Sequence, residues 1–408
     1  MDVGPQPATE IADVSPQGRP RRALTYLFIT LFLDILGFGM LVPVIPFLIK
    51  PFDDSALAVG LLAMSFSIAQ LFASPILGAL SDRFGRKPVL LSCILGSTLA
   101  YATFGFATAL WVFFAARIWD GITGGDISVA QAYIADVSEP ENRSKNLGLI
   151  GAAFGLGFVI GPAMGGALSA IDLQLTAFIS AGICALSALF GWIFLPETLS
   201  PEYRRDHPIH IHDFNPLRQV IPFLRNPIIL GNFFMYFVIG MAMNALRSNF
   251  AVYARDGLQF DAMHVGYLYA YLGAIVVFTQ AVLVRRLAPK LGDQRTAVFG
   301  LSSMVVGFIW MATEPQLWEI ACIMPLVAVG NGLCFPTITA LSSRAVDARQ
   351  QGSVMGAQQS VGSFAMILGP LLAGWSFDHI SMGAPYGFGA VFLIIGLIFS
   401  WRRFMQSA

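Results

Sequence analysis

The chain has 408 residues, of which 56% are hydrophobic and only 12% are charged, and its formal net charge at pH 7 is zero. Soluble proteins carry about a quarter charged residues, so this composition excludes a water-soluble domain of this size. The balanced charge gives no sign of nucleic-acid binding. A lipid bilayer is the environment that such a chain requires.

Residues 1–22 are polar and rich in proline, and we expect them to form a disordered cytoplasmic tail. Twelve apolar segments follow, each close to the roughly 20 residues that cross a bilayer as a helix. They are expected at 24–49, 56–80, 88–107, 109–137, 146–170, 175–195, 227–254, 263–288, 295–312, 316–344, 352–378 and 384–402. The polar loop at 196–226 separates the first six from the last six. The sequence thus predicts an all-α polytopic membrane protein with six-helix bundles at 23–195 and 227–403.

The basic residues are distributed unevenly between the loops. With both termini in the cytoplasm, twenty Lys and Arg residues fall in cytoplasmic segments, whereas only Lys50 and Arg255 fall in outside loops. Positively charged loops remain on the cytoplasmic side of a membrane. We therefore expect an integral protein of the inner or plasma membrane with both termini in the cytoplasm.

One acid lies deep in the first predicted span. Asp34 is about ten residues into that span, roughly 15 Å deep at 1.5 Å per residue. An ionisable group in hydrocarbon is costly, so it is by default a functional-site hypothesis. We expect Asp34 to be the best candidate for a proton-coupling site. The open alternative is a purely structural buried acid.

The stretch "GALSDRFGRKP" (78–88) places four charges in a short turn between the second and third spans. Asp82 would end the second helix close to the start of the eleventh, near Gly352. A helix N-terminus has unpaired N–H groups and a partial positive charge, and it attracts a carboxylate. We therefore expect a conformational latch here. The alternative is a positive cluster that only fixes topology.

The fourth predicted span carries Arg117, roughly 12 Å deep, and two acids. A helical wheel places a polar arc on one face of this span, and Asp126 about 180° away from Arg117. The arc comprises Arg117, Asp120, Gly121, Gly124, Ser128 and Gln131. We expect it to line water or substrate, with Asp120 and Asp126 as reserve proton-coupling sites. The alternatives are a self-neutralising Arg117–Asp120 pair and a hydrogen-bonded structural Asp126.

The seventh predicted span has a comparable face. Tyr236, Gly240, Met243, Arg247 and Phe250 share an arc of about 80°. We expect Tyr236, Met243 and Arg247 to line a substrate cavity together with Arg117, Ser128 and Gln131 of the fourth span.

The second half repeats the first at an offset of 208 residues. Gly124 then falls on Gly332, Gly161-Pro162 on Gly369-Pro370, and Gly166 on Gly374. Parallel six-helix halves with a binding site between them are a transporter architecture.

The sequence lacks signs of catalysis or of ATP-driven transport. It has no phosphate-binding loop of the G-x-x-x-x-G-K-[ST] type. The four cysteines lie within spans without paired spacing, and we interpret His207, His210 and His212 of the central loop as solvated. We expect no enzyme activity, no cofactor and no metal. Energy would come from an ion gradient or from the gradient of the substrate itself.

The whole chain resembles the major facilitator superfamily, and most of all the drug/proton antiporters of the tetracycline-efflux type. "GALSDRFGRK" resembles the loop pattern between helices 2 and 3, and "GLGFVIGPAMGG" (155–166) the antiporter pattern of helix 5. "LDILGFGMLVPVIP" (33–46) and "RIWDGITGG" (117–125) resemble the patterns of helices 1 and 4. The second-half counterpart "RLAPKLGDQR" (286–295) departs from the loop pattern, with Pro289 in place of the acid.

The resemblance implies roles for two groups of residues. The latch group is Gly78, Asp82, Arg83, Gly85, Arg86 and Asp136, and the antiporter group of helix 5 is Gly157, Gly161, Pro162, Gly165 and Gly166. By resemblance, Asp82, Arg86 and Asp136 hold the cytoplasmic side shut in the outward-open state. Helices 1, 4, 7 and 10 would surround the central cavity.

We expect a monomeric secondary transporter that works by alternating access. It would export a lipophilic or amphiphilic small molecule in exchange for protons, with the bilayer as its surroundings. The first alternative is a metabolite or sugar uniporter or symporter of the same fold. The second is a transport-inactive membrane scaffold or sensor.

Overall fold

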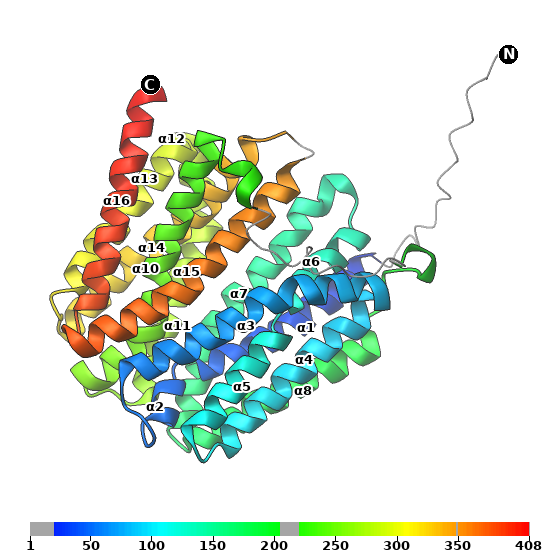
Figure 1. The fold of residues 1–408 in the computed structure, drawn as a ribbon, viewed down its shortest axis with the longest axis horizontal. Helices are drawn as coiled ribbons and strands as arrows, with labels where there is room; N and C mark the ends of the chain where they lie inside the picture. The colour runs from blue at the N-terminus through cyan, green and yellow to red at the C-terminus, as the bar shows by residue number, and fades with distance from the viewer. Residues whose placement is uncertain (1–19, 205–219, 348–349, 408) are drawn as a thin grey trace.

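The computed structural model describes residues 20–204, 220–347 and 350–407, and its helices occupy all twelve predicted spans (Figure 1). The N-terminal half contains α1 (Pro20–Leu41), α2 (Ile45–Ile49), α3 (Ala56–Phe84), α4 (Arg86–Phe106), α5 (Leu110–Thr123), α6 (Asp126–Val137), α7 (Pro140–Ser169) and α8 (Leu173–Phe194). The C-terminal half contains α10 (Pro227–Gly257), α11 (Ala262–Phe278), α12 (Val284–Leu291), α13 (Asp293–Met311), α14 (Leu317–Arg344), α15 (Gln351–His379) and α16 (Ala384–Ser407). Short 3-10 turns lie at Pro201–Tyr203 and Ile221–Phe223. No strand occurs in these three described ranges.

The first predicted span, 24–49, is not one helix. The first helix, α1, ends at Leu41, and the short helix α2 begins at Ile45. Pro43 lies between them, and proline has no N–H to continue a helix and restricts the residue before it. The eighth span is also irregular, because a π-helical segment, Thr279–Leu283, joins α11 to α12.

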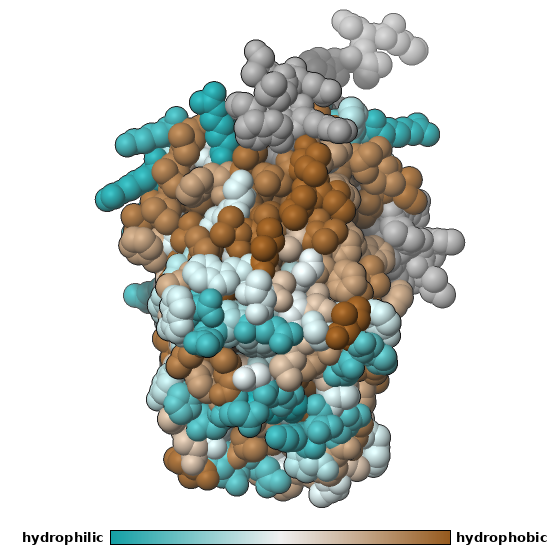
Figure 2. Space-filling model, turned by 90° about the vertical axis from the view of Figure 1, so that its left-hand side faces the viewer, coloured by the Kyte–Doolittle hydropathy of each residue, from teal (hydrophilic) through white to brown (hydrophobic). Residues whose placement is uncertain are grey.

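Buried hydrophobic side chains form one core cluster drawn mainly from α1–α8 and a second from α10–α16. Large apolar side chains are also exposed, among them Trp111, Trp192 and Trp318 at 63 to 71%. Figure 2 shows brown, hydrophobic side chains over a broad area of one face, with teal, hydrophilic side chains gathered beside and below it. Within the described residues, nine helices are long and apolar enough to cross a membrane. The exposed apolar surface fits contact with lipid.

The two bundles meet along two helix pairs, α3 with α15 and α7 with α11. The helices α3 and α15 lie side by side in Figure 1. Gly60 of α3 faces the backbone of Pro370, and Gly166 of α7 faces Gly266 of α11, with no room for a side chain at either glycine. Small residues permit such close backbone contact between membrane helices.

Two ends of the molecule serve as landmarks. The Arg86 end is the one where α3 ends and α4 begins, and where α10 and α15 start. The Arg255 end is the opposite one, where α3 starts and α10 and α15 finish. The start of α1 and the end of α16 both lie at the Arg86 end, so the first and last helices have their chain ends on the same side of the molecule.

Candidate functional site

The fourth predicted span, 109–137, is interrupted in its middle. The helix α5 ends at Thr123 and α6 begins at Asp126, with Gly124 and Gly125 between them. The prediction of a single continuous helix was wrong here. Two adjacent glycines weaken a helix because they lose more backbone entropy than other residues. The interruption leaves unpaired N–H groups at the start of α6.

The neighbouring helix α3 supports this interruption. The side-chain amide of Gln70 donates a hydrogen bond to the carbonyl oxygen of Gly124 at 2.6 Å. The hydroxyl of Ser128 lies 3.2 Å from the carbonyl oxygen of Ser74 and 2.7 Å from that of Gly125. Ser128, which the sequence places on a cavity face, is therefore engaged with backbone at the helix break.

The helix break brings two of the predicted acids together. Asp126 is the first residue of α6, and its carboxyl is an electrostatic neighbour of that of Asp34 on α1. Asp120 of α5 is a further electrostatic neighbour of Asp34. All three acids are buried, at 8% exposure or less. In the described residues, Oδ1 of Asp34 has no hydrogen-bond partner. The three predicted proton-coupling acids thus form one cluster.

A hydrogen bond between Asp34 and Asp126 would require a proton. An ionised carboxylate has only acceptor oxygens, so two of them cannot bond to each other. Two like charges at close range in a poorly hydrated site also disfavour the doubly ionised state. Burial and proximity therefore favour a state of this acid pair that holds one proton, with the positive end of α6 beside Asp126.

Arg117 is paired within its own helix. Its Nη1 lies 3.1 Å from Oδ2 of Asp120, and both side chains are buried. The guanidinium also lies over the rings of Phe38, Phe66 and Phe104, at 5.8, 5.5 and 5.4 Å from their centroids. The self-neutralising pair that the sequence left open is thus present, inside an aromatic enclosure that favours the cation.

The other predicted cavity residues have different surroundings. Gln131 is exposed, Tyr236 is half-buried against the ring of Phe335, and Arg247 is exposed. Met243 is only 1% exposed and belongs to the hydrophobic core of the C-terminal bundle. Its assignment to a cavity was wrong, because the arc of α10 that carries it also packs against neighbouring helices.

The glycines of α7 pack against α1. Gly157 faces Ile35, Gly161 faces the backbone of Gly39, and Gly165 faces the backbone of Met40. Gly166 and the carbonyl oxygen of Pro162 face α11, whereas the ring of Pro162 lies near Gly39 of α1. The predicted helix-5 group therefore packs α7 against α1 on one side and against the other bundle on the other.

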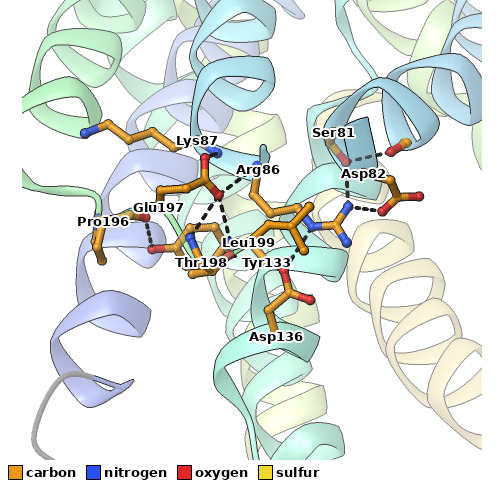
Figure 3. Close-up of polar contacts among 11 residues, drawn as sticks. Ser81, Asp82, Arg86, Lys87, Tyr133, Asp136, Pro196, Glu197, Thr198 and Leu199 are labelled. Carbon is orange, nitrogen blue, oxygen red and sulfur yellow. Dashed lines mark hydrogen bonds and ion pairs between the residues drawn. The ribbon is translucent and has the colours of Figure 1, made fainter. Parts of the chain in front are cut away.

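At the Arg86 end, the predicted latch residues form a polar network (Figure 3). Nε of Arg86 donates to Oδ2 of Asp136 at 2.9 Å, and Nη1 donates to Oγ of Ser81 at 2.7 Å. Nη1 also lies 2.5 Å from Oδ1 of Asp82. The contact from Arg86 to Asp136, expected by resemblance, is confirmed. Arg83 is exposed and lies over the ring of Phe84.

Glu197 belongs to this network but was missed in the sequence. Its carboxylate accepts hydrogen bonds from the backbone N–H of Arg86 at 2.9 Å and of Lys87 at 3.2 Å, at the start of α4. Gly85 has φ +108°, and a Cβ there would collide with the Glu197 carboxylate. Tyr133 donates to the carbonyl oxygen of Pro196 at 2.8 Å beside it. The available signal was a lone acid directly after the sixth span.

Asp82 contacts Arg86 rather than the other bundle. For the part of the chain that the structure describes, no hydrogen bond joins Asp82 to the start of α15. The expected latch between Asp82 and α15 belongs to a state with the Arg86 end closed, so it stays a prediction.

At the Arg255 end, four hydrogen bonds join the two bundles. Arg255 of α10 donates to the carbonyl oxygens of Pro46 at 3.0 Å and Asp54 at 2.7 Å. Asp378 of α15 accepts from the backbone N–H of Ala56 at 3.0 Å and of Leu57 at 2.8 Å. This end is therefore closed by contacts between the bundles.

Known proteins resemble this chain over most of its length. The Major Facilitator Superfamily model matches residues 27–370. The chain is 32% identical over 357 residues to the tetracycline resistance protein, class C, of Escherichia coli, with 87% of this chain and 89% of that protein covered. It is 29% identical to multidrug resistance protein 2 of Bacillus subtilis (strain 168), with 91% and 92% covered. The crystal structure of the human organic anion transporter MFSD10 (TETRAN) matches with a TM-score of 0.73 at 25% identity, covering 94% of this chain and 100% of that one.

Proposed function

Because this chain belongs to the Major Facilitator Superfamily, we propose that it is a secondary transporter that exports a lipophilic or amphiphilic small molecule in exchange for protons. Alternating access would expose one central site first to one side of the membrane and then to the other. The similarity to a tetracycline resistance protein and to a multidrug resistance protein supports the drug-like substrate class.

One observation carries the proton exchange: the acids Asp34 and Asp126 are buried neighbours inside the N-terminal bundle. Ionisable residues within membrane spans mark ion pathways and proton relays. Two neighbouring buried acids favour a state with one bound proton, and Oδ1 of Asp34 is left without a partner in the described residues. Loss of the proton would leave two adjacent carboxylates. The coupling step of the proposal is therefore protonation of this pair.

Arg117 and Asp120 adjust the charge of the same cluster. In the protonated state, Arg117 is neutralised by Asp120 and the acid pair carries one charge beside the start of α6. When the proton leaves, the added negative charge raises the attraction for Arg117 or for a positive group on a substrate. Substrate and proton would then compete for one electrostatic site, which is the requirement for exchange.

We assign the Arg86 end to the cytoplasm, since positively charged loops are retained on that side. The contacts of Arg255 and Asp378 close the opposite end. This conformation would accept substrate from the cytoplasm. Export then requires those four hydrogen bonds to break while the Arg86 end closes.

The test is transport by purified protein in proteoliposomes with an imposed pH gradient, with tetracycline and ethidium as probes. We expect the gradient to drive accumulation of at least one probe. The triple variant Asp34→Asn/Asp120→Asn/Asp126→Asn should lose this dependence. If the triple variant kept full dependence on the gradient, proton exchange at this cluster would be wrong.

A second candidate is transport without protons. The human relative is an organic anion transporter, so the fold also suits a carrier that follows the gradient of its substrate. This function would be favoured if the rate and the final level of transport by the unsubstituted protein did not depend on the pH gradient.

A further inference from the structure

Arg247 lies in the space between the two bundles. It belongs to α10, about ten residues and therefore roughly 15 Å from the end of that helix at Gly257. Its side chain is exposed, whereas Leu246 and Phe250 on the same helix are buried. Its guanidinium lies 5.5 Å from the ring centroid of Phe158, which is on α7 of the other bundle. A positive charge thus faces the interface between the bundles at depth.

Arg247 has no anionic partner within the described residues, and this sets it apart from the other deep arginine. Arg117 is paired with Asp120 at 3.1 Å. The electrostatic neighbours of Arg247 are the phenols of Tyr236 and Tyr269, which are neutral. A positive charge at this depth is costly, and such charges are normally paired. Because the Arg247 side chain is exposed to the space between the bundles, its unpaired charge is available to an anionic group from outside the chain.

The surroundings of Arg247 are aromatic. The ring of Phe158 contacts that of Phe38 edge to face at 6.1 Å, and Phe38 in turn lies under Arg117. On the side of α10, Tyr236 packs edge to face on Phe335 at 4.9 Å. Aromatic rings offer a flat apolar surface that accepts rings of many shapes. Arg247 therefore combines one unpaired charge with a lining that suits an aromatic body.

We propose that Arg247 binds an anionic group of the transported molecule, so that the substrate is an aromatic amphiphile that carries a carboxylate or sulfonate in addition to the positive group attracted by the acid cluster. This inference rests on the proposed transport function and names its substrate. The guanidinium supplies two parallel N–H donors to such a group. The rings of Phe158 and Tyr236 contact the apolar body. Arg117 is excluded from this role because its guanidinium is already paired with the carboxylate of Asp120.

The probes for the test are 1-anilinonaphthalene-8-sulfonate and N-phenyl-1-naphthylamine, which share a skeleton and differ by the sulfonate. Binding of each is measured by fluorescence with the protein in nanodiscs, after subtraction of protein-free nanodiscs. The variants are Arg247→Gln and Arg247→Lys. The matched control is Arg285→Gln, which removes an exposed positive charge of α12 outside the interface.

We expect Arg247→Gln to weaken sulfonate binding about tenfold, the value of one charged hydrogen bond. Binding of the neutral amine should change by less than about twofold, which also shows that the variant is folded. Arg247→Lys should restore only part of the sulfonate affinity, because it keeps the charge but loses the two parallel N–H donors. Arg285→Gln should leave both affinities unchanged.

The inference is overturned if Arg247→Gln weakens both probes equally or neither. It is also overturned if the unsubstituted protein shows no saturable sulfonate binding. Transport driven by a pH gradient is measured in a separate experiment, so that the substrate class and the proton exchange are tested independently. A protein that binds the sulfonate through Arg247 but ignores the gradient contradicts only the proton exchange. A protein that follows the gradient but binds the sulfonate independently of Arg247 contradicts only the substrate class.

Discussion

The carboxylate of Asp378 accepts a hydrogen bond from the backbone N–H of Leu57 at 2.8 Å, although the two residues belong to different bundles. Asp378 lies in the last turn of α15, and Leu57 lies in the first turn of α3. Asp82 has the matching position in the last turn of α3. Each of these two helices thus ends in an acid, and the acid of α15 contacts the start of α3. The latch expected for Asp82 therefore has an observed counterpart at the opposite end.

Substitution Asp378→Asn should loosen the Arg255 end. A carboxylate at a helix N-terminus contributes up to about 1–2 kcal/mol, so the population with this end closed should fall about fivefold to tenfold. Distances between spin labels placed on the ends of α3 and α15 measure this population. The matched control is Asp261→Asn, which removes an acid that caps α11 at the same end but within one bundle. An equal shift in both variants would show that the contact between the bundles is not the cause.

Substitution Asp82→Asn should act in the opposite direction, because it removes the acid that we expect to hold the Arg86 end closed. The expected cost is on the order of 1–2 kcal/mol, or about a tenfold shift toward the conformation described above. Transport should fall in parallel. Arg285→Gln is the control, since Arg285 is an exposed charge of α12 that does not belong to the latch group. Normal transport and an unchanged distance distribution in Asp82→Asn would contradict the latch.

Substitution Asp34→Asn should abolish export driven by a pH gradient while it preserves some substrate binding. The amide cannot exchange a proton but keeps the size of the carboxyl and its ability to bond with Asp126. Proteoliposome uptake with and without a gradient, together with counterflow without one, separates the two effects. Glu202→Gln removes an exposed acid outside the spans and should change neither. If Asp34→Asn retained full gradient dependence, the exchanging proton would have to be assigned to Asp120 or Asp126.

Substitution Arg117→Met should destabilise the protein strongly, because it leaves Asp120 buried without a positive partner. Breaking a buried ion pair from one side costs about 3–5 kcal/mol. The double variant Arg117→Met/Asp120→Asn should be the more stable of the two, since no charge remains unpaired. Thermal unfolding in detergent, followed by size-exclusion chromatography, compares them. A loss in the double variant equal to the sum of the losses in Arg117→Met and in Asp120→Asn alone would mean that the pair at 3.1 Å contributes no coupling energy.

Substitution Gly85→Ala should disturb the Arg86 network. Gly85 has φ +108°, and an added Cβ would meet the Glu197 carboxylate. Backbone strain of this kind costs about 1–3 kcal/mol. Gly78→Ala is a control from the same motif, because its Cβ would meet only Oγ of Ser128 at 4.0 Å. We expect a lower unfolding temperature for Gly85→Ala but not for Gly78→Ala. Equal unfolding temperatures would show that Glu197 moves aside without cost.

Hydropathy and charge placement predicted the spans because membrane insertion selects for exactly those averages over about 20 residues. Averaged hydropathy did not predict the helix break at Gly124 and Gly125, since two glycines hardly change the mean hydropathy of a long window. A helical wheel drawn through that break placed Asp126 away from Arg117, and it did not reveal the contact with Asp34. Contacts between spans depend on how helices pack, which no single span encodes.

The network around Arg86 likewise contains some residues that the sequence identified and others that only the packed structure brings in. The family resemblance identified both Arg86, which lies in the loop motif, and Asp136, which lies at the end of the fourth span. Glu197 lies 111 residues from Arg86 and joins it only through folding. Met243 was assigned to a cavity from its arc on one helix, but neighbouring helices bury it. Sequence patterns locate faces of helices, and only the packed bundle determines what each face meets.

The Glu197 contact also has a consequence for biosynthesis. The start of α4 remains uncapped until the ribosome has added Glu197, which follows the last helix of the N-terminal bundle. Domains of a nascent chain generally fold as units, with the N-terminal one first. In the described residues, the hydrogen-bond partners of Arg86 and Glu197 lie at or before Leu199. The first six spans can thus complete their own assembly in the membrane while the second six are still being translated.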